Sequence, residues 1–228
     1  MVRRILASVG IFTMALPLGS DALAQAGMTA TTGRPFALRG VELGITLDQF
    51  KAIPVPADDG ETETQTWCTD QTLPRQLSYW QPSPQEMGPI ITCEWFSKQS
   101  FSVLGVSNHF LSLGEGKGVA TFRFVEKEGA WRLFQISVKA NNQYYPAIAD
   151  ALTRKYGAGK TTTEPFQTRS GDMFDNDITV WKNSLSSIRL EERYGERDRY
   201  LLTYRDEALS KLVDAEIERS RALAAEKI

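Results

Sequence analysis

Histidine, cysteine and long apolar runs are scarce in this sequence, and each scarcity excludes a class of protein. The 228 residues include one histidine, His109, and two cysteines, Cys68 and Cys93. Structural zinc sites usually take four cysteine or histidine ligands, so we expect no metal and no other cofactor. A serine or cysteine nucleophile needs a base, usually histidine, and the chain has no G-x-S-x-G motif. We interpret His109, in SNHFLSL, as a surface or partly buried residue at a strand edge, and we expect no catalytic residues and no enzymatic activity.

The longest apolar run, ILASVGIFTMALPLG, covers 15 residues, fewer than the about 20 that span a bilayer. It follows Arg3 and Arg4 and precedes small residues, which is the pattern of a secretory signal peptide over residues 1–26. We expect cleavage after Ala26, with Ala24 as the alternative. A membrane anchor is the competing interpretation, and Pro17 disfavours it. The sequence therefore predicts a periplasmic or secreted protein without a transmembrane span.

Basic and acidic residues occur in nearly equal numbers. Cleavage would remove two of the 26 basic residues and one of the 28 acidic residues, which leaves 24 against 27, a net charge of −3. The chain therefore has no surplus of basic residues that would indicate nucleic-acid binding. The remaining 202 residues suffice for one large domain or two small modules.

The two cysteines suit an oxidising compartment. Cys68 and Cys93 are predicted to form a disulfide, because such bonds persist in exported proteins. A metal pair or a reactive thiol is the alternative, which the single histidine disfavours.

The first half is expected to run from residue 36 to 140, after a flexible leader at 27–35. TLDQFKAI has capping-box spacing and one apolar face, so it predicts a short helix at 46–53. An acidic loop and a proline-rich stretch with little regular structure are expected to follow, up to the strand IITCEWF at 90–96. FSVLGVS and HFLSLG could form two further strands. The last elements of this half form a hairpin, 119–125 with 131–138, which turns at Lys127-Glu128-Gly129. Its second strand is expected to place Leu133, Gln135 and Ser137 on one face and Phe134, Ile136 and Val138 on the other.

The second half is expected to run from residue 141 to 228. It begins with a helix that Asn142 caps and Gly157 ends. A three-stranded meander follows at 177–183, 186–193 and 198–204, and Asp206 caps a final helix. Leu209, Leu212, Val213 and Ile217 are expected to face the core. The predicted fold is α+β, with antiparallel sheets, helices on one face, a possible tandem helix–strand pseudo-repeat and a long C-terminal helix.

Two segments, GVELGITLDQFKAIP and YYPAIADALTRKYGAGK, resemble small exported modules in which helices pack on an antiparallel meander. Such modules include the small lipoprotein of the outer-membrane β-barrel assembly machine and the tandem repeats of β-lactamase inhibitor protein. Unlike the lipoprotein, this chain has no lipobox cysteine. The resemblance implies a binding or scaffolding role.

Two glycine-rich segments suggest nucleotide loops but do not fit them. In YGAGKTTT the first glycine of a phosphate loop should stand at 154, where the chain has arginine. The segment also follows a helix and does not open one, so a helix C-cap with a polar turn is the better interpretation. GEGKG at 114–118 is interpreted as a hairpin turn.

Acidic residues gather in GDMFDND, where Asp172, Asp175 and Asp177 could hold calcium. An EF-hand loop beginning at Asp175 would need glycine at 180 and glutamate at 186, and the chain has valine and serine. A solvated turn is therefore favoured. Paired carboxylates for glycoside cleavage can meet from anywhere in a fold, so a carboxylate hydrolase stays open.

Aromatic residues crowd around the predicted disulfide. Most should be core residues, but some could form a contact surface, because aromatic side chains are enriched where proteins meet. The candidates are Trp67, Tyr79, Trp80, Trp95 and Phe101. We therefore expect a non-enzymatic periplasmic binding or accessory protein whose partner is another envelope protein. The alternatives are a small-molecule or glycan binder with an aromatic pocket and a carboxylate hydrolase.

Overall fold

A computed structural model describes residues 33–56, 63–72, 80, 90–98 and 106–225. These residues form a small two-stranded ladder and one ten-stranded sheet, both antiparallel. In chain order the elements are β1 (Ala37–Leu38), β2 (Val41–Glu42), α1 (Leu47–Lys51), β3 (Thr64–Cys68), β4 (Ile90–Lys98), β5 (Val106–Asn108), β6 (Phe110–Leu113), β7 (Gly116–Lys127), β8 (Ala130–Asn141), the 3₁₀ turn Asn142–Tyr144, α2 (Tyr145–Tyr156), β9 (Lys160–Gln167), β10 (Met173–Lys182), β11 (Ser186–Glu191), β12 (Arg199–Asp206) and α3 (Glu207–Ala225). The mixed α+β class and the antiparallel pairing agree with the sequence analysis.

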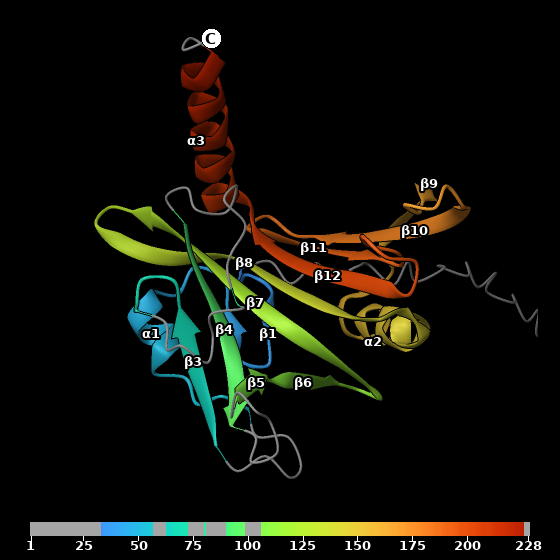
Figure 1. The fold of residues 1–228 in the computed structure, drawn as a ribbon, viewed down its shortest axis with the longest axis horizontal. Coiled ribbons are helices and arrows are strands. Elements are labelled where there is room, and N and C mark those ends of the chain that lie inside the picture. The colour runs from blue at the N-terminus through green and yellow to red at the C-terminus, as the bar shows by residue number, and fades with distance from the viewer. Residues whose placement is uncertain (1–32, 57–62, 73–79, 81–89, 99–105, 226–228) are drawn as a thin grey trace, which may run out of the picture.

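The strands of the large sheet follow the order β3-β4-β7-β8-β12-β11-β10-β9, with β5 beside β4 and β6 beside β7. β8 and β12 join the two sequence halves, because Ser137 pairs with Thr203 in the middle of a seven-pair ladder. The sheet is strongly twisted, so that β3 and β4 run steeply across the direction of β10 and β11 (Figure 1). Residues on either side of position 140 therefore belong to one sheet.

The predicted hairpin is the longest ladder of the sheet. Lys127 pairs with Ala130, and the two turn residues Glu128 and Gly129 have φ values of 55° and 77°. Positive φ at both positions is typical of the tight turn whose twist matches that of the strands. The same ladder contains a bulge beside Arg123 and Phe124.

The bulge corrects the predicted alternation of β8. Leu133 packs with Ile136 and Val138 in the main core, whereas Phe134 packs in a separate cluster with α3. Leu133 was expected on the opposite face from Ile136. One extra residue opposite β7 shifts the alternation of side chains by one position, so the prediction was wrong here.

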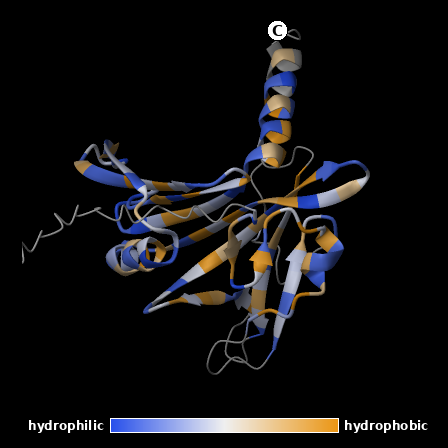
Figure 2. Cartoon of the chain, turned by 180° about the vertical axis from the view of Figure 1, so that it is seen from behind, coloured by the Kyte–Doolittle hydropathy of each residue, from blue (hydrophilic) through white to orange (hydrophobic). Residues whose placement is uncertain are grey.

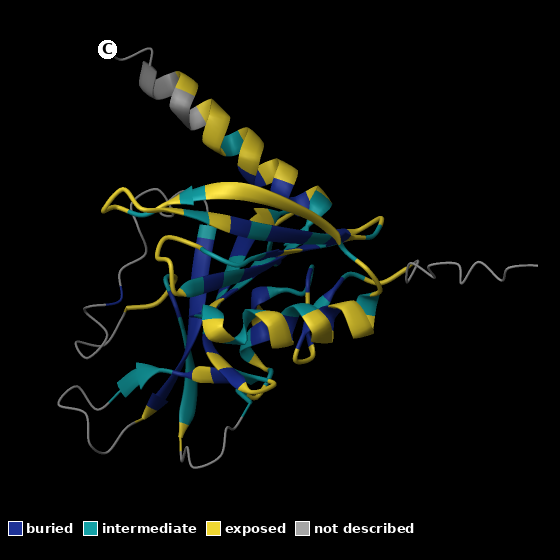
Figure 3. Cartoon of the chain, turned by 90° about the vertical axis from the view of Figure 1, so that its right-hand side faces the viewer, coloured by how far each residue is buried: buried dark blue, intermediate teal, exposed yellow. Residues whose placement is uncertain are grey.

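The main core lies on one face of the sheet, under α1, α2 and the β1–β2 ladder. Its largest side chains include Trp95, Phe122 and Tyr200 from the strands and Phe50 from α1. Phe50 lies 4.5 Å from Phe122 between ring centroids. Hydrophobic and hydrophilic residues alternate along the strands (Figure 2), and α2 keeps its outer side exposed (Figure 3). Residues of both halves thus share one core.

The caps of the two core helices follow the sequence closely. Thr46 and Gln49 form the predicted capping box of α1, and Gly157 ends α2 with a φ of 83°. Asn142 does not cap, because Asn141 accepts a hydrogen bond from Gln143 N at the start of the 3₁₀ turn. Asn141 thus caps the 3₁₀ turn, and α2 itself begins after Tyr144 without a side-chain cap.

The C-terminal helix projects from the body of the protein (Figure 1). Asp206 caps it as predicted, by accepting hydrogen bonds from Ala208 N and Leu209 N. Leu209 and Val213 pack on Val125 and Phe134. Val125 follows the core residue Phe124 on β7, so α3 packs on the face opposite to α1 and α2, and the expectation of helices on one face fails for α3.

Two residues of α3 that were expected in the core face solvent. Leu212 is 44 % exposed and Ile217 is 36 % exposed. Leu212 lies between the packed residues Leu209 and Val213 but on the outward side of the helix, and Ile217 lies beyond the turns that contact the sheet.

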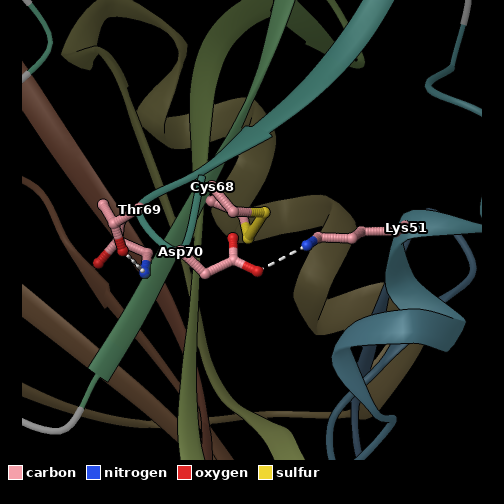
Figure 4. The surroundings of a disulfide bond; sticks show 6 residues. Lys51, Cys68, Thr69 and Asp70 are labelled. Carbon is pink, nitrogen blue, oxygen red and sulfur yellow. Dashed lines mark hydrogen bonds and ion pairs between the residues drawn. A yellow bond between two sulfur atoms is a disulfide. The ribbon is translucent and has the colours of Figure 1, made fainter. Parts of the chain in front are cut away.

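The predicted disulfide is present between Cys68 and Cys93, which are directly paired residues of β3 and β4. Beside it, Lys51 Nζ of α1 contacts Asp70 Oδ2 at 2.8 Å (Figure 4). The disulfide and this ion pair fasten the edge strand β3 to the rest of the molecule.

Four strands of the described residues were missed, and two of them are the short strands β1 and β2. β3 lies where an acidic loop and an irregular stretch were expected, and β9 follows α2 where only the later meander was predicted. β4, β5, β6, β10, β11 and β12 match predicted strands within a few residues. The predicted signal peptide and almost all of the leader, like residues 101–105, lie outside the described residues.

Candidate functional site

The face of the sheet opposite the main core is polar, and we call it the open face. Along β4 the core takes Ile91, Cys93 and Trp95, and the alternate residues point to the open face. α3 covers one end of this face through Val125 and Phe134. The rest carries hydroxyl, amide and charged side chains, and it contains the most chemically distinctive cavity of the described residues.

This cavity, which we call the Glu94 pocket, has a volume of about 430 Å³. β4, β5, β7, β8 and β12 supply its floor, and two loop aromatics stand at its margin. Its lining residues are Trp80, Glu94, Asn108, Val119, Thr121, Arg123, Gln135, Ser137, Lys139, Tyr194 and Leu201.

Glu94 is the buried acid of the pocket, with 8 % of its surface exposed. Its Oε1 accepts a hydrogen bond from Thr121 Oγ1 at 2.8 Å, and its Oε2 accepts one from Asn108 Nδ2 at 2.7 Å. Burial raises the pKa of Glu94 above its ordinary value, although hydrogen bonds from Thr121, Trp80 and Asn108 and the charge of Arg123 act against the rise. The carboxyl group is therefore held in one orientation by fixed donors.

Two aromatic residues reach the pocket from opposite sides. The Trp80 ring packs edge-on against Phe96 of β4, with 5.5 Å between centroids. Tyr194 lies in the β11–β12 turn and is 44 % exposed, while its backbone N–H donates to Arg199 O at 2.8 Å. The two rings offer apolar surface beside polar groups, the combination that is typical of small-molecule pockets.

Cationic side chains accompany this single acid. Arg123 and Lys139 both line the pocket. Gln135 and Ser137 also line it, and the distance from Gln135 Nε2 to the accepting Ser137 Oγ is 3.0 Å. The pocket therefore has two cations and one carboxyl group, in a protein whose net charge is −2. It can offer hydrogen-bond donors and acceptors, positive charge and ring surface to a ligand.

The five aromatic candidates fall in different places. Trp67 and Trp80 belong to one small cluster with Phe96 and Val106 on the open face. Trp95 lies in the main core and is 2 % exposed, so it offers no surface to a partner. Tyr79 and Phe101 lie outside the described residues. Of the predicted set, Trp80 lines the Glu94 pocket and Trp67 lies beside it.

His109 is buried, with 1 % of its surface exposed, so the expectation of a surface or partly buried position was wrong. Its Nδ1 lies 2.9 Å from Ser97 Oγ, and its ring meets Trp95 edge-on. The residue belongs to the packing between β4 and the β5–β6 connection.

The remaining motifs have structural roles. In YGAGKTTT, Gly157 ends α2 and its carbonyl accepts a hydrogen bond from Trp181 Nε1 at 2.8 Å, while Lys160 begins β9. In GEGKG, residues 114 and 115 form the turn between β6 and β7. Asp172 accepts a hydrogen bond from Ser170 Oγ in a turn, and Asp177 accepts one from Thr163 Oγ1. The helix C-cap at Gly157 and the turn at residues 114 and 115 agree with the sequence interpretation, whereas Asp175 and Asp177 lie within β10 and not in the expected turn.

Sequence reasoning missed Glu94, Arg123 and Lys139. The strand IITCEWF gave a usable signal, because its alternation places Glu94 between Thr92 and Phe96 on the face away from the cysteine. A carboxylate in so apolar a strand is uncommon, since burying an acid costs free energy. The neighbours on β7 and β8 could be assigned to the pocket only from the register.

Among the described residues no group of three or more His, Cys, Asp or Glu side chains is arranged to hold a metal ion. Within the same residues no helix has both the length and the apolar character needed to cross a membrane. No family model, curated protein or solved structure matches the chain.

Proposed function

We propose that this is an exported, non-enzymatic binding protein and that its ligand is a small polar molecule or glycan held in the Glu94 pocket. The observation that carries the proposal is the oriented, buried carboxyl group of Glu94 beneath Trp80 and Tyr194. A merely solvated sheet face has no need of a buried acid with fixed donors on both oxygens. The N-terminal apolar segment and the disulfide between Cys68 and Cys93 support export to the periplasm.

A carboxylate hydrolase is less well supported. Glycoside cleavage usually takes two carboxyl groups that flank the scissile bond. Glu94 is the single acidic residue among those that line the pocket. One acid, already bonded to Thr121 and Asn108, suits binding better than proton transfer.

Contact with an envelope protein is the second candidate, and α3 favours it. This helix projects from the body (Figure 1), and it exposes Leu212 on the outward side of its packed turns and Ile217 beyond them. The predicted tandem repeat and the resemblance to helix-on-meander modules would also suit such a role. The open face combines apolar side chains with charged and hydroxyl groups that line a cavity, and this mixture suits a ligand site better than a protein-docking surface.

Two sets of variants separate these candidates. We would apply the mature protein, from residue 27, to an array of neutral and acidic glycans, and test amino acids and sugars for shifts in melting temperature. Trp80→Ala and Tyr194→Ala should abolish ligand binding, whereas the double variant Leu212→Ala, Ile217→Ala should leave it unchanged. If the α3 variant alone loses binding, or if the pocket variants bind as wild type does, the ligand site lies elsewhere and the proposal fails.

A further inference from the structure

The register of the sheet places a row of small hydroxyl side chains across the open face. Glu94 of β4 pairs with Thr121 of β7, Thr121 with Ser137 of β8, Ser137 with Thr203 of β12, and Thr203 with Arg189 of β11. Paired residues of neighbouring strands point to the same face. The row therefore begins at a carboxyl group, continues over three hydroxyls and ends at a guanidinium group.

Longer side chains stand on both sides of this row. One flanking row holds Arg123, Gln135 and Arg205, which are paired in that order across β7, β8 and β12. The other holds Val119, Lys139, Leu201 and Glu191, paired across β7, β8, β12 and β11. Val119 is no larger than the threonines of the central row, so the long borders are Arg123, Gln135 and Arg205 on one side and Lys139, Leu201 and Glu191 on the other. Between these borders the short side chains form a trough that runs across the strands. We call it the hydroxyl groove.

A second cavity extends the Glu94 pocket along the same row. It has a volume of about 360 Å³ and is lined by Gln135, Val180, Ser187, Arg189, Glu191, Thr203 and Arg205. Gln135 lines both cavities, so the two are neighbours on one face. Five strands separated by about 4.8 Å each give the groove a length of roughly 19 Å from Glu94 to Arg189. A single small molecule would occupy only part of it.

Structural elements close the long sides of the groove. At one side Arg205 of β12 reaches Ser210 Oγ and Asp214 Oδ1 of α3, at 3.2 and 3.4 Å. At the other side stands Tyr194 in the β11–β12 turn. The two ends are bounded by Trp80 and, beyond Arg189, by Val180 of β10. The shape suits a linear ligand that lies across the strands.

The charge of the groove differs in sign from that of the chain. Its two cavities are lined by four cationic residues, Arg123, Lys139, Arg189 and Arg205, and by two acidic residues, Glu94 and Glu191. Arg189 Nε is paired with Glu191 Oε1 at 2.9 Å, and Arg205 is close to Asp214. Lys139 has no ion pair with another described residue. With Asp214 counted, the surplus is one positive charge in a protein of net charge −2.

The side chains favour a glycan over a peptide. Extended peptides bind sheets by adding a strand at an edge, through backbone hydrogen bonds. The hydroxyl groove lies on a sheet face, where the strands already pair on both sides and only side chains are offered. Hydroxyl and amide groups both donate and accept, so they match a chain rich in hydroxyl groups.

We propose that the hydroxyl groove binds a linear acidic oligosaccharide, whose units follow the row from Glu94 to Arg189 and whose carboxylates meet Lys139 and the arginines. This inference rests on the proposed function, because the Glu94 pocket is one end of the groove. Hydroxyl groups of the ligand bind to Thr121, Ser137 and Thr203. A sugar ring at the Glu94 end packs on Trp80, and Tyr194 borders the bound chain at the long side of the groove.

Isothermal titration calorimetry of the mature protein tests the inference. The probes are hexamers of galacturonate, mannuronate and hyaluronan, the corresponding uronate monomers, neutral maltohexaose and cellohexaose, and a hexaglutamate peptide. At least one acidic hexamer should bind about tenfold more tightly than its monomer and than either neutral hexamer, because charge-assisted hydrogen bonds are roughly twice as strong as neutral ones. Its affinity should fall as salt rises, as expected for exposed charges.

Variants locate the bound chain. Ser137→Leu raises the floor in the middle of the groove, and Arg189→Ala removes its far end. Each should weaken hexamer binding about tenfold, which for Arg189→Ala is roughly the loss of one hydrogen bond to a charged group. Monomer binding should survive Arg189→Ala. The matched controls are Thr162→Leu on the exposed strand β9 and Arg154→Ala on α2, which should bind as wild type does. Unchanged melting temperatures show that the variants are folded.

The outcomes separate this inference from the proposed function. Equal affinity for monomer and hexamer, lost on Trp80→Ala but not on Arg189→Ala, overturns the groove and leaves the Glu94 pocket. Equal binding of neutral and acidic hexamers overturns the acidic class, and tighter binding of hexaglutamate than of every sugar overturns the glycan class. No binding to any acidic hexamer overturns the inference outright. A silent glycan array and ligand screen would overturn the proposed function as well.

Discussion

Reduction of the disulfide should destabilise the protein by an amount that follows from its place in the chain. Cys68 and Cys93 are 25 residues apart, so the bond closes a loop of 26 residues. The chain-entropy relation for such a loop gives about 3.5 kcal/mol at 25 °C. The reduced chain keeps its native packing at this point, because both sulfurs lie in the main core and the two cysteines are paired across β3 and β4. For a chain of this length the loss corresponds to a fall in melting temperature of roughly 7–14 °C.

Urea unfolding of the mature protein with and without a phosphine reductant measures this loss. Tryptophan fluorescence is a suitable signal, because Trp95 lies in the same core cluster as the disulfide. The double variant Cys68→Ala, Cys93→Ala is the control, and the reductant should not change its midpoint. A reduced protein within about 1 kcal/mol of the oxidised one would refute the reasoning. It would mean that the β3–β4 ladder already holds the loop closed in the unfolded ensemble.

Three further predictions concern single residues. Gly159→Ala should cost about 1–3 kcal/mol in urea unfolding, because its new Cβ would lie 2.6 Å from Thr179 Cγ2, whereas Lys160→Ala should stay within about 0.5 kcal/mol and show no response to nucleotides. Thr46→Ala should cost about 1 kcal/mol by removing the capping box of α1, and a Thr46→Ser variant that loses as much would contradict this. Burial raises the pKa of Glu94 above its ordinary 4.5, so its favourable contribution is complete below pH 4.5 and is lost as pH rises through the raised pKa. Glu94→Gln should therefore match the wild-type free energy of unfolding in acid and exceed it at neutral pH. If the variant is less stable than wild type at neutral pH, the ionised carboxylate stabilises the fold and this prediction is wrong.

Local patterns predicted the elements whose signals are contained in a few neighbouring residues. The capping box at Thr46, the C-cap at Gly157 and the cap at Asp206 are where the sequence placed them, because each depends on side chains within three residues. The hairpin at Glu128 and Gly129 was predictable for the same reason. The disulfide was predictable because the chain has two cysteines and an N-terminal segment from which export was predicted.

Features that depend on distant partners were not predictable. β9 is exposed along almost its whole length, so it has no apolar alternation, and only its pairing with β10 makes it a strand. The β8 bulge follows from the register against β7, and it reversed the expected side of Leu133. Leu212 and Ile217 were expected on the core side of α3, but Leu212 faces outward between the packed residues Leu209 and Val213, and Ile217 lies beyond the turns that contact the sheet. In each case the deciding contact lies outside the window in which the pattern is read.

The candidate site belongs to this second group, and its stability cost argues for its use. Glu94, Ser137 and Thr203 are on three strands that are far apart in the sequence, and each alone looks like an ordinary polar residue of a half-buried sheet. Together they form the floor of a groove that a purely structural sheet would not require. A buried carboxyl group with a raised pKa lowers the stability of the folded protein at neutral pH. A glutamine would avoid that cost and keep an acceptor for Thr121, provided that Asn108 turns its amide oxygen toward the new Nε2, so an acid at this position points to a use for its charge or its proton. The stability of Glu94→Gln and its affinity for acidic glycans are therefore best measured together, because a gain in stability with a loss of binding is the signature of a functional site.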